Sequence, residues 1–154
     1  MRRIDREITD KTEIIKILES AFVCHLGLTD GNMPYVVPMN FAYKDNAIYL
    51  HCASQGRRLD MLKKNSNVCF QVELTPGTIV ENGDQPCEWG VKFRSVIGFG
   101  KAEILQSRDD KLKGLTIFMG RFSGNKFTFP EGEIDATTVI KISIDEMTGK
   151  TAND

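Results

Sequence analysis

Ile48-Tyr-Leu-His-Cys-Ala-Ser-Gln-Gly-Arg-Arg-Leu-Asp-Met-Leu62 is the stretch from which the fold of this chain can be worked outward. Its first residues are β-branched, aromatic and apolar, which is typical of a strand, here one that ends near His51. A polar break, Ser-Gln-Gly, follows. Leu59 and Leu62 then share one face of a short helix, which we expect to run to about Asn65. The stretch therefore predicts a strand, a turn and a helix in direct succession.

Two arginines, Arg57 and Arg58, occupy the first turn of this helix. The free backbone N–H groups of a helix N-terminus already carry partial positive charge, so cations there indicate a function unless something local balances them. A phosphate held by the helix N-terminus, by Ser54 and by both guanidinium groups would supply that balance. The other interpretation, which the local residues leave open, is that both arginines extend into solvent and Gly56 only turns the chain.

Upstream of this stretch the pattern predicts one helix and two strands. Asp10 can cap the helix, and a strand follows from Phe22 to Thr29. The second strand is expected from Pro34 to Tyr43. Pro38 has no N–H to donate to a ladder, so this strand should lie at a sheet edge or contain a bulge. A bulge would free backbone groups beside the Asn40 amide for a ligand, whereas a plain edge strand would not.

Downstream, clean alternation from Val68 to Leu74 predicts another strand. Thr75 to Cys87 is rich in turn residues and is expected to be irregular, either as a mobile lid or as an exposed connection. Trp89 to Leu105 is expected to form one long strand or two, bent near Gly98 and Gly100, as in a small barrel.

The last part of the chain is expected to contain a second helix, an irregular segment and a final strand. Ser107 can cap the helix, residues 120–136 are rich in Gly and Phe, and Thr137 to Asp145 alternates as a strand. About six strands and three helices are predicted in all, mostly in meanders. Strands and helices do not alternate regularly along the chain, as they do in a doubly wound parallel sheet. We therefore predict a closed or split antiparallel barrel with peripheral helices.

Length and composition narrow the classes of protein. The 154 residues are expected to form one domain, 1–154, and 20 basic against 21 acidic residues argue against nucleic acid as the main partner. No apolar run has the length of a signal peptide or a membrane span, so a cytoplasmic protein is expected. The cysteines are scattered, which predicts free thiols rather than a disulfide framework. They are Cys24, Cys52, Cys69 and Cys87.

Several familiar catalytic and metal signatures are missing from the sequence. Cys24-His25 and His51-Cys52 are neighbours on predicted strands, so the two members of each pair point to opposite faces, and no metal site is predicted. There is no Gly-x-Ser-x-Gly elbow, no Walker loop and no Gly-x-Gly-x-x-Gly that opens a helix. Serine hydrolases and the usual binders of nucleoside triphosphates or dinucleotides are therefore disfavoured.

A set of short motifs occurs here in the order and spacing of one known family. The motifs are Arg2-Arg-x-Asp-Arg-Glu7, Pro34-Tyr-Val-Val-Pro-Met-Asn-Phe41, Tyr49-Leu-His-x-Ala53, Gly56-Arg-Arg58, Asn65-x-x-Val-Cys-Phe70, Arg94-Ser-Val-Ile-Gly98 and Thr148-Gly-Lys150. Through them the chain resembles the flavin-binding split-barrel family related to pyridoxamine 5′-phosphate oxidase. The resemblance is to its Nim-type branch, the 5-nitroimidazole-resistance-like proteins, and it extends over nearly the whole chain.

The resemblance implies a mainly β fold with peripheral helices, a six-stranded antiparallel Greek-key split barrel that binds FMN at the interface of a homodimer. It implies that Arg58 holds the phosphate of FMN, with Ser54, Gly56 and Arg57 beside it. The remaining contacts that it implies, along the flavin ring and toward the ribityl side, come from Val37, Pro38, Met39, Asn40, Phe41, His51, Ser95 and Val96.

The function expected from the resemblance is an FMN-dependent oxidoreductase that passes hydride or electrons to a small acceptor such as a nitro compound. His51 is the candidate acid or base if it faces the ring; otherwise it is a hydrogen-bonded histidine at a strand end. The chain ends at Asp154 without the C-terminal segment with which pyridoxamine 5′-phosphate oxidase proper grips its substrate, so that enzyme's own activity is not expected.

Two other functions are considered. One is a non-catalytic flavin-binding or flavin-sensing protein, which would apply if no room is left above the ring. The other is a haem-binding split barrel with His25 or His51 as the iron ligand.

Overall fold

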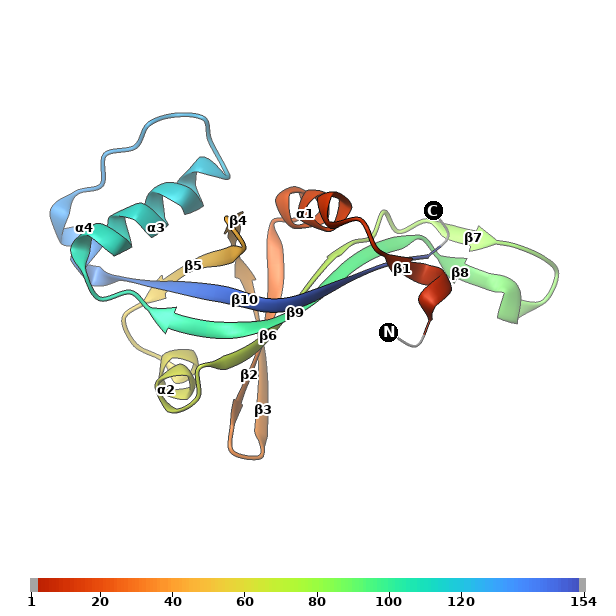
Figure 1. The fold of residues 1–154 in the computed structure, drawn as a ribbon, viewed down its shortest axis with the longest axis horizontal. Coiled ribbons are helices and arrows are strands. Elements are labelled where there is room, and N and C mark those ends of the chain that lie inside the picture. The colour runs from red at the N-terminus through yellow and green to blue at the C-terminus, as the bar shows by residue number, and fades with distance from the viewer. Residues whose placement is uncertain (1–2, 153–154) are drawn as a thin grey trace.

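One large antiparallel sheet with helices around it forms the body of the computed structural model, which describes residues 3–152 (Figure 1). The first residue of the N-terminal motif, Arg2, lies outside this range. The strands of the sheet are β1 (Glu7–Ile8), β2 (Val23–Asp30), β3 (Met33–Asn40), β4 (Ala42–Lys44), β5 (Ala47–Ala53), β6 (Asn67–Leu74), β9 (Phe93–Ile104) and β10 (Thr137–Ala152). They follow the order β3-β2-β6-β9-β10-β5-β4, and β1 pairs with β10.

The predicted fold class is confirmed. The strands with seven residues or more, β2, β3, β5, β6, β9 and β10, are the six that the sequence predicts. All their pairings are antiparallel. The strands at the two ends of the order, β3 and β4, do not pair with each other in the described residues, so the sheet is open, as in a split barrel. The helices are α1 (Lys11–Ser20), α2 (Arg57–Lys64), α3 (Arg108–Gly120) and α4 (Glu131–Ala136), with short 3-10 turns at Ile4–Arg6 and Pro86–Glu88.

The edge interpretation of Pro38 is confirmed, but the strand that contains it is shorter than predicted. β3 lies at one end of the sheet order, and its register with β2 runs without a bulge from Met33 opposite Asp30 to Asn40 opposite Val23. The prediction of one strand up to Tyr43 is wrong. The chain leaves the ladder at Phe41, whose side chain is completely buried, and it resumes as β4.

Both segments that were expected to be irregular contain regular structure. Residues 75–87 include β7 (Ile79–Glu81), which pairs with β8 (Trp89–Val91) in a hairpin that projects from the body (Figure 1). Residues 120–136 end in α4. For Trp89–Leu105 the sequence predicts one long strand or two, and the structure has two, β8 and β9 (Phe93–Ile104). The last strand is also longer than predicted, because β10 continues past a register shift at Ile144/Glu146.

The core lies between the inner face of the curved sheet and α1. Ile14, Ile17 and Leu18 of α1 are buried against the sheet interior, and α1 begins where predicted, because the Asp10 side chain accepts a hydrogen bond from the Thr12 N–H at 2.8 Å. Close packing also requires a glycine at position 98 of β9, near which the sequence predicts a bend. A Cβ there would lie 2.2 Å from Cζ of Phe70.

A second, smaller apolar cluster joins α3 and α4 to the outer face of β10. It consists of Leu105, Leu115, Ile134 and Val139, with Phe129 packed against it. α3 thus covers the side of β5 and β10 that α1 does not. No helix in residues 3–152 is both long enough and apolar enough to cross a membrane.

The cysteines have free thiols, as predicted. Burial raises the pKa of the Cys24 thiol to about 12, so this thiol is an inert core group.

Candidate functional site

The strand, turn and helix predicted for residues 48–62 are confirmed, and they place a small pocket at the N-terminus of α2. β5 ends at Ala53, and Gly56 is the N-cap residue of α2, with a φ of +135° that favours glycine. The backbone carbonyl of Gly56 accepts hydrogen bonds from the Leu59 and Asp60 N–H groups. The pocket has a volume of about 150 Å³ and is lined by Tyr35, Gln55, Gly56, Arg57, Arg58 and Leu59.

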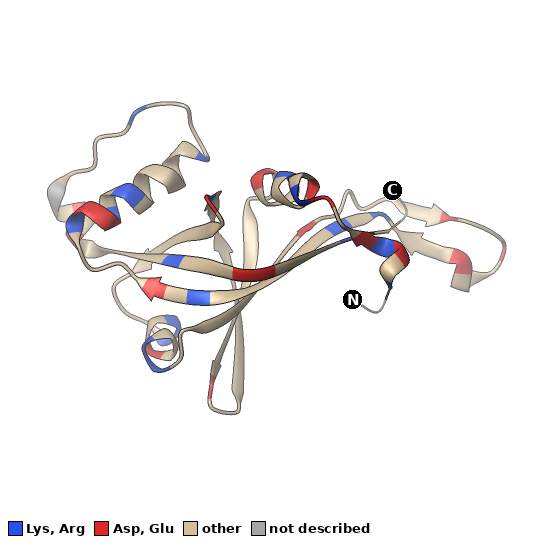
Figure 2. Ribbon diagram, viewed as in Figure 1, with Lys and Arg blue, Asp and Glu red and all other residues tan. Residues whose placement is uncertain are grey.

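Arg58 is the half-buried cation of this pocket. Its Nε is buried and has no hydrogen-bond partner in residues 3–152, and its Nη1 lies 2.6 Å from Sδ of Met39. A thioether sulfur is only a weak acceptor, and a buried guanidinium without an anion is costly. Arg57 is exposed, and its guanidinium carbon lies 5.1 Å from the centre of the Tyr35 ring. Figure 2 shows how basic residues gather on α2. The pocket therefore fits an anion.

A row of aromatic rings connects two other predicted site residues, Asn40 and His51. The His51 ring meets Phe118 of α3 edge-on at a centroid distance of 4.4 Å, Phe118 lies 5.0 Å from Phe122, and Phe122 lies 5.9 Å from Phe22. The Asn40 side chain donates to the Phe22 carbonyl at 3.2 Å. Phe22 and Phe122 are 55% and 40% exposed, so the row offers an aromatic surface to a planar ligand.

The far end of this aromatic row carries a second arginine that is short of acceptors. The Arg121 guanidinium lies 4.6 Å from the centre of the Phe22 ring, and Nη2 donates to the Ala21 carbonyl at 3.2 Å. Its Nε is buried and has no partner in the described part of the chain. Sequence reasoning missed Arg121, and it also missed Phe22, Phe118, Phe122 and Tyr35.

Two predicted site residues, Phe41 and Val96, are completely buried in the chain by itself. Phe41 packs between β3 and β4 and Val96 on the inward side of β9, and their contact with a cofactor stays a prediction. Met39 is nearly as buried, and it reaches the site through Arg58.

Ser95 lies on β9, three strands from β3 in the sheet order, and β3 contributes Tyr35 to the α2 pocket. Pro38, His25, Gln71 and Ile97 face one another across four neighbouring strands, and Ser95 lies two residues from Ile97 on β9. Three strand spacings, about 14 Å, therefore separate the Pro38 strand from the Ser95 strand. Val37 and Pro38 stay on β3, while Ser54 is exposed between β5 and α2.

The protonation of His51 gives a testable property of the site. Desolvation against its neighbours lowers the pKa of His51 below its ordinary value of 6.5, so the ring is mostly neutral at pH 7. We expect an NMR titration of the His51 ring to have a midpoint below 6.5, and we expect Phe118→Ala, which removes the ring that covers it, to move the midpoint back toward that value.

The lowered pKa of His51 also determines how its contribution to the stability of the fold changes with pH. Because the unfolded chain binds this proton more tightly, the contribution of His51 is present above the unfolded pKa and is lost as pH falls through the folded pKa. In the variant Phe118→Ala that part of the pH dependence should shrink. An unchanged His51 midpoint in that variant would contradict the assigned cause.

Comparison with known proteins places these features in a family. Residues 10–151 match the family model described as pyridoxamine 5′-phosphate oxidase. A search of the curated proteins finds no similar sequence.

Solved structures share the fold. A candidate 5-nitroimidazole antibiotic resistance protein from Bacteroides thetaiotaomicron is 34% identical and has a TM-score of 0.84, with 94% of this chain and 86% of that chain covered. The flavocytochrome Anf3 from Azotobacter vinelandii is 25% identical, with a TM-score of 0.85 over 100% of this chain and 72% of that one. An FAD and haem binding protein from Mycobacterium smegmatis has a TM-score of 0.86 at 19% identity, with 97% and 74% covered.

The family model matches most of the chain, and this match agrees with both the sequence resemblance and the split-barrel fold. The chain belongs to the pyridoxamine 5′-phosphate oxidase family of flavin-binding split-barrel proteins.

Proposed function

We propose that the protein binds FMN and uses it to reduce a small acceptor, with the phosphate of FMN at the N-terminus of α2. The observation that carries this proposal is the half-buried Arg58, whose Nε has no acceptor in the described residues. It lies at the helix end where backbone N–H groups favour an anion. Arg57 and Gly56 line the same pocket. A phosphate would satisfy the guanidinium and neutralise both cations.

The aromatic row supports a planar ring as the other part of the ligand. Phe22 and Phe122 present exposed faces, and Asn40 and His51 lie at the two ends of the row. When bound, the flavin would supply hydride and electron transfer. Desolvation by burial lowers the pKa of His51, so its ring is largely neutral at pH 7 and can donate or accept a hydrogen bond. Arg121 adds positive charge beside Phe22, where it would stabilise negative charge on a reduced ligand.

We also propose that the protein forms a homodimer. The outer face of the sheet carries exposed apolar side chains on β3 and β9, which are separated by β2 and β6 in the sheet order: Val36 is 63% exposed, and Ile97 and Phe99 are 44% and 48% exposed. Val36, Gly27, Cys69 and Phe99 face one another across this sheet in register. Such a face fits a second copy, and the partner copy would complete the cofactor site with residues such as its own Ser95.

The acceptor we propose is a small nitro compound, because the similar protein from Bacteroides thetaiotaomicron is described by resistance to 5-nitroimidazoles. The test is the absorption spectrum of the freshly purified protein, followed by anaerobic reduction with NAD(P)H and reoxidation by a nitroimidazole. A flavin spectrum that bleaches and returns is the expected result. A Soret band would overturn the proposal in favour of haem. Bound flavin that is inert to reductants and acceptors would leave a flavin-binding protein without turnover.

A further inference from the structure

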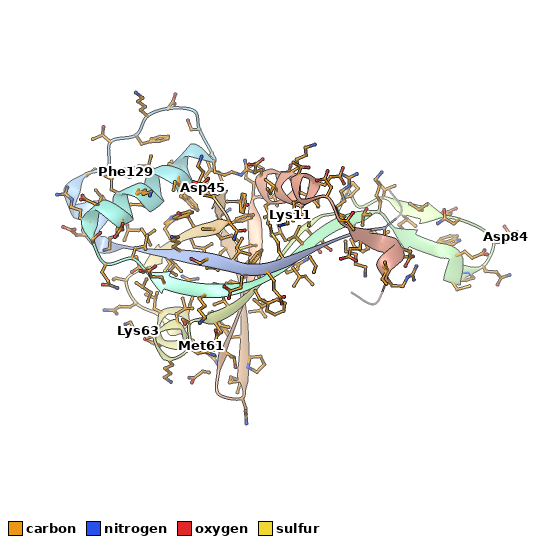
Figure 3. The ribbon with its side chains drawn as sticks, in the orientation of Figure 1. Lys11, Asp45, Met61, Lys63, Asp84 and Phe129 are labelled. Carbon is orange, nitrogen blue, oxygen red and sulfur yellow. The ribbon has the colours of Figure 1, made fainter. Side chains whose placement is uncertain are left out.

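A cavity between α3 and the β4–β5 hairpin shares no lining residue with the α2 pocket. Its volume is about 680 Å³, within the range of small-molecule sites. Tyr49 and Lys141, which face each other on β5 and β10, line it from the sheet, and Leu112 and Ile117 line it from α3. In Figure 3 the label Asp45 marks a residue of the hairpin turn that borders the cavity.

α3 packs closely on the sheet beside this cavity. Gly114 is buried, and a Cβ there would lie 2.7 Å from Cγ1 of Val139 and 3.5 Å from Cδ1 of Tyr49. The helix therefore approaches β10 and β5 closely along the Gly114 line. The cavity lies beside this close approach, with Leu112, Lys113, Thr116 and Ile117 of α3 in its lining.

Tyr49 carries a polar group in this cavity that the protein does not satisfy. The residue is only 7% exposed, and its hydroxyl makes no hydrogen bond within residues 3–152. The hydroxyl is not one of the buried side-chain atoms without a partner in the described residues, which are Arg58 Nε and Arg121 Nε, so it keeps access to solvent through the cavity. Since Tyr49 lines the cavity, its hydroxyl is available to a molecule bound there.

Three lysines from three different elements surround the same space. They are Lys44 at the end of β4, Lys113 on α3 and Lys141 on β10. None of them forms an ion pair with a carboxylate in the described part of the chain. Asp109, which also lines the cavity, lies in the first turn of α3, where the helix dipole already stabilises its charge. Three lysines and two carboxylates, Asp45 and Asp109, line the cavity, so its lining carries an excess of one positive charge.

We propose that this cavity is a second ligand site, which binds a small organic oxyanion with an apolar body. The acidic group lies among the ammonium groups of Lys44, Lys113 and Lys141 and accepts a hydrogen bond from the Tyr49 hydroxyl. The apolar body packs on Leu112 and Ile117. The site is independent of flavin binding, although α3 contributes to both regions through different residues, Phe118 on one side and Lys113 with Ile117 on the other.

The test uses phenyl phosphate as the probe, added to the full chain in the presence of excess FMN so that the α2 pocket is not available to it. Backbone amide shifts in NMR spectra should move at Lys113, Thr116 and Ile117. Loss of one charge-assisted contact in Lys113→Gln or Lys141→Gln should weaken the probe roughly tenfold, and Tyr49→Phe should also weaken it. Lys11→Gln, which removes one positive charge from the N-terminus of α1, is the matched control and should bind as tightly as the original protein.

Several results would overturn the proposal. Shifts confined to α2 would mean that the probe finds only the other anion site, and phenol binding as tightly as phenyl phosphate would remove the role of the charge. Equal affinity in the Lys113→Gln, Lys141→Gln and Lys11→Gln variants would do the same. Tyr49→Phe keeps the buried ring, and a melting curve like that of the original protein shows that its effect is on binding and not on folding.

Discussion

Replacement of Arg58 by alanine is expected to weaken FMN binding roughly ten- to hundredfold, the effect of losing a charge-assisted hydrogen bond to phosphate. The reason lies in the placement of the guanidinium, which is half-buried at the positive end of α2 and has an Nε without a partner in residues 3–152. Fluorescence titration of flavin-free protein with FMN measures the affinity directly.

Two controls separate a phosphate contact from a general loss of positive charge or of structure. Lys63→Ala removes a cation from the last turn of the same helix, far from the pocket lining, and should leave FMN affinity nearly unchanged. Riboflavin, which has no phosphate, should bind Arg58→Ala as well as it binds the original protein. If riboflavin and FMN weaken by the same factor, Arg58 supports the pocket and does not bind phosphate.

Gly100→Ala is expected to cause the largest loss of stability, about 3 kcal/mol in the free energy of unfolding, at the upper end of the usual cost of overpacking. A Cβ at this position would lie 2.1 Å from the Ser143 carbonyl oxygen and 3.2 Å from Cα of Ile144. Both neighbours are backbone atoms of β10, beside the register shift at Ile144/Glu146. They cannot rotate away as a side chain can, so β9 and β10 would have to separate locally.

The measurement is urea denaturation at a fixed flavin concentration, and the matched control is the same substitution at Gly124. No atom lies within 4 Å of the Cβ position there, so Gly124→Ala should leave the midpoint unchanged or raise it slightly through the lower entropy of the unfolded chain. A Gly100→Ala midpoint equal to that of Gly124→Ala would show that the β9–β10 contact yields more easily than this geometry allows.

The elements predicted most accurately from the sequence were those fixed by short-range rules. Asp10 caps α1, and Val68, Phe70 and Val72 of β6 alternate into the core, because a cap or a two-residue period is encoded within a few residues. The break at Phe41 was missed, since Tyr35 to Tyr43 keeps an apparent two-residue period while the chain changes its partner from β2 to β5.

The β7–β8 hairpin was missed for a different reason. Its strands have three residues each and are separated by a loop that contains a 3-10 turn at Pro86–Glu88. Turn residues dominate such a segment, so composition indicated an irregular connection although Ile79 and Val91 face each other in a ladder.

Only the part of the candidate site that is continuous in sequence could be predicted from the residues alone. Residues 54–58 follow a strand and begin a helix, so their local charges already indicated an anion. The aromatic row combines Phe22, Phe118 and Phe122, which come together only after α3 packs on β5. Nothing in the spacing of these residues along the chain encodes that contact.

The position of β10 has a consequence for how the protein is made. β10 is the last described strand, yet it lies between β9 and β5, and β5 with β4 joins the sheet through it in the described residues. During synthesis, the ladder edges of β9 and β5 therefore stay unpaired until residues 137–152 have left the ribosome. Long-range pairing of this kind folds slowly and exposes strands that can associate with other chains. We therefore expect β10, which covers the ladder edges of both β9 and β5, to protect the chain from association during folding.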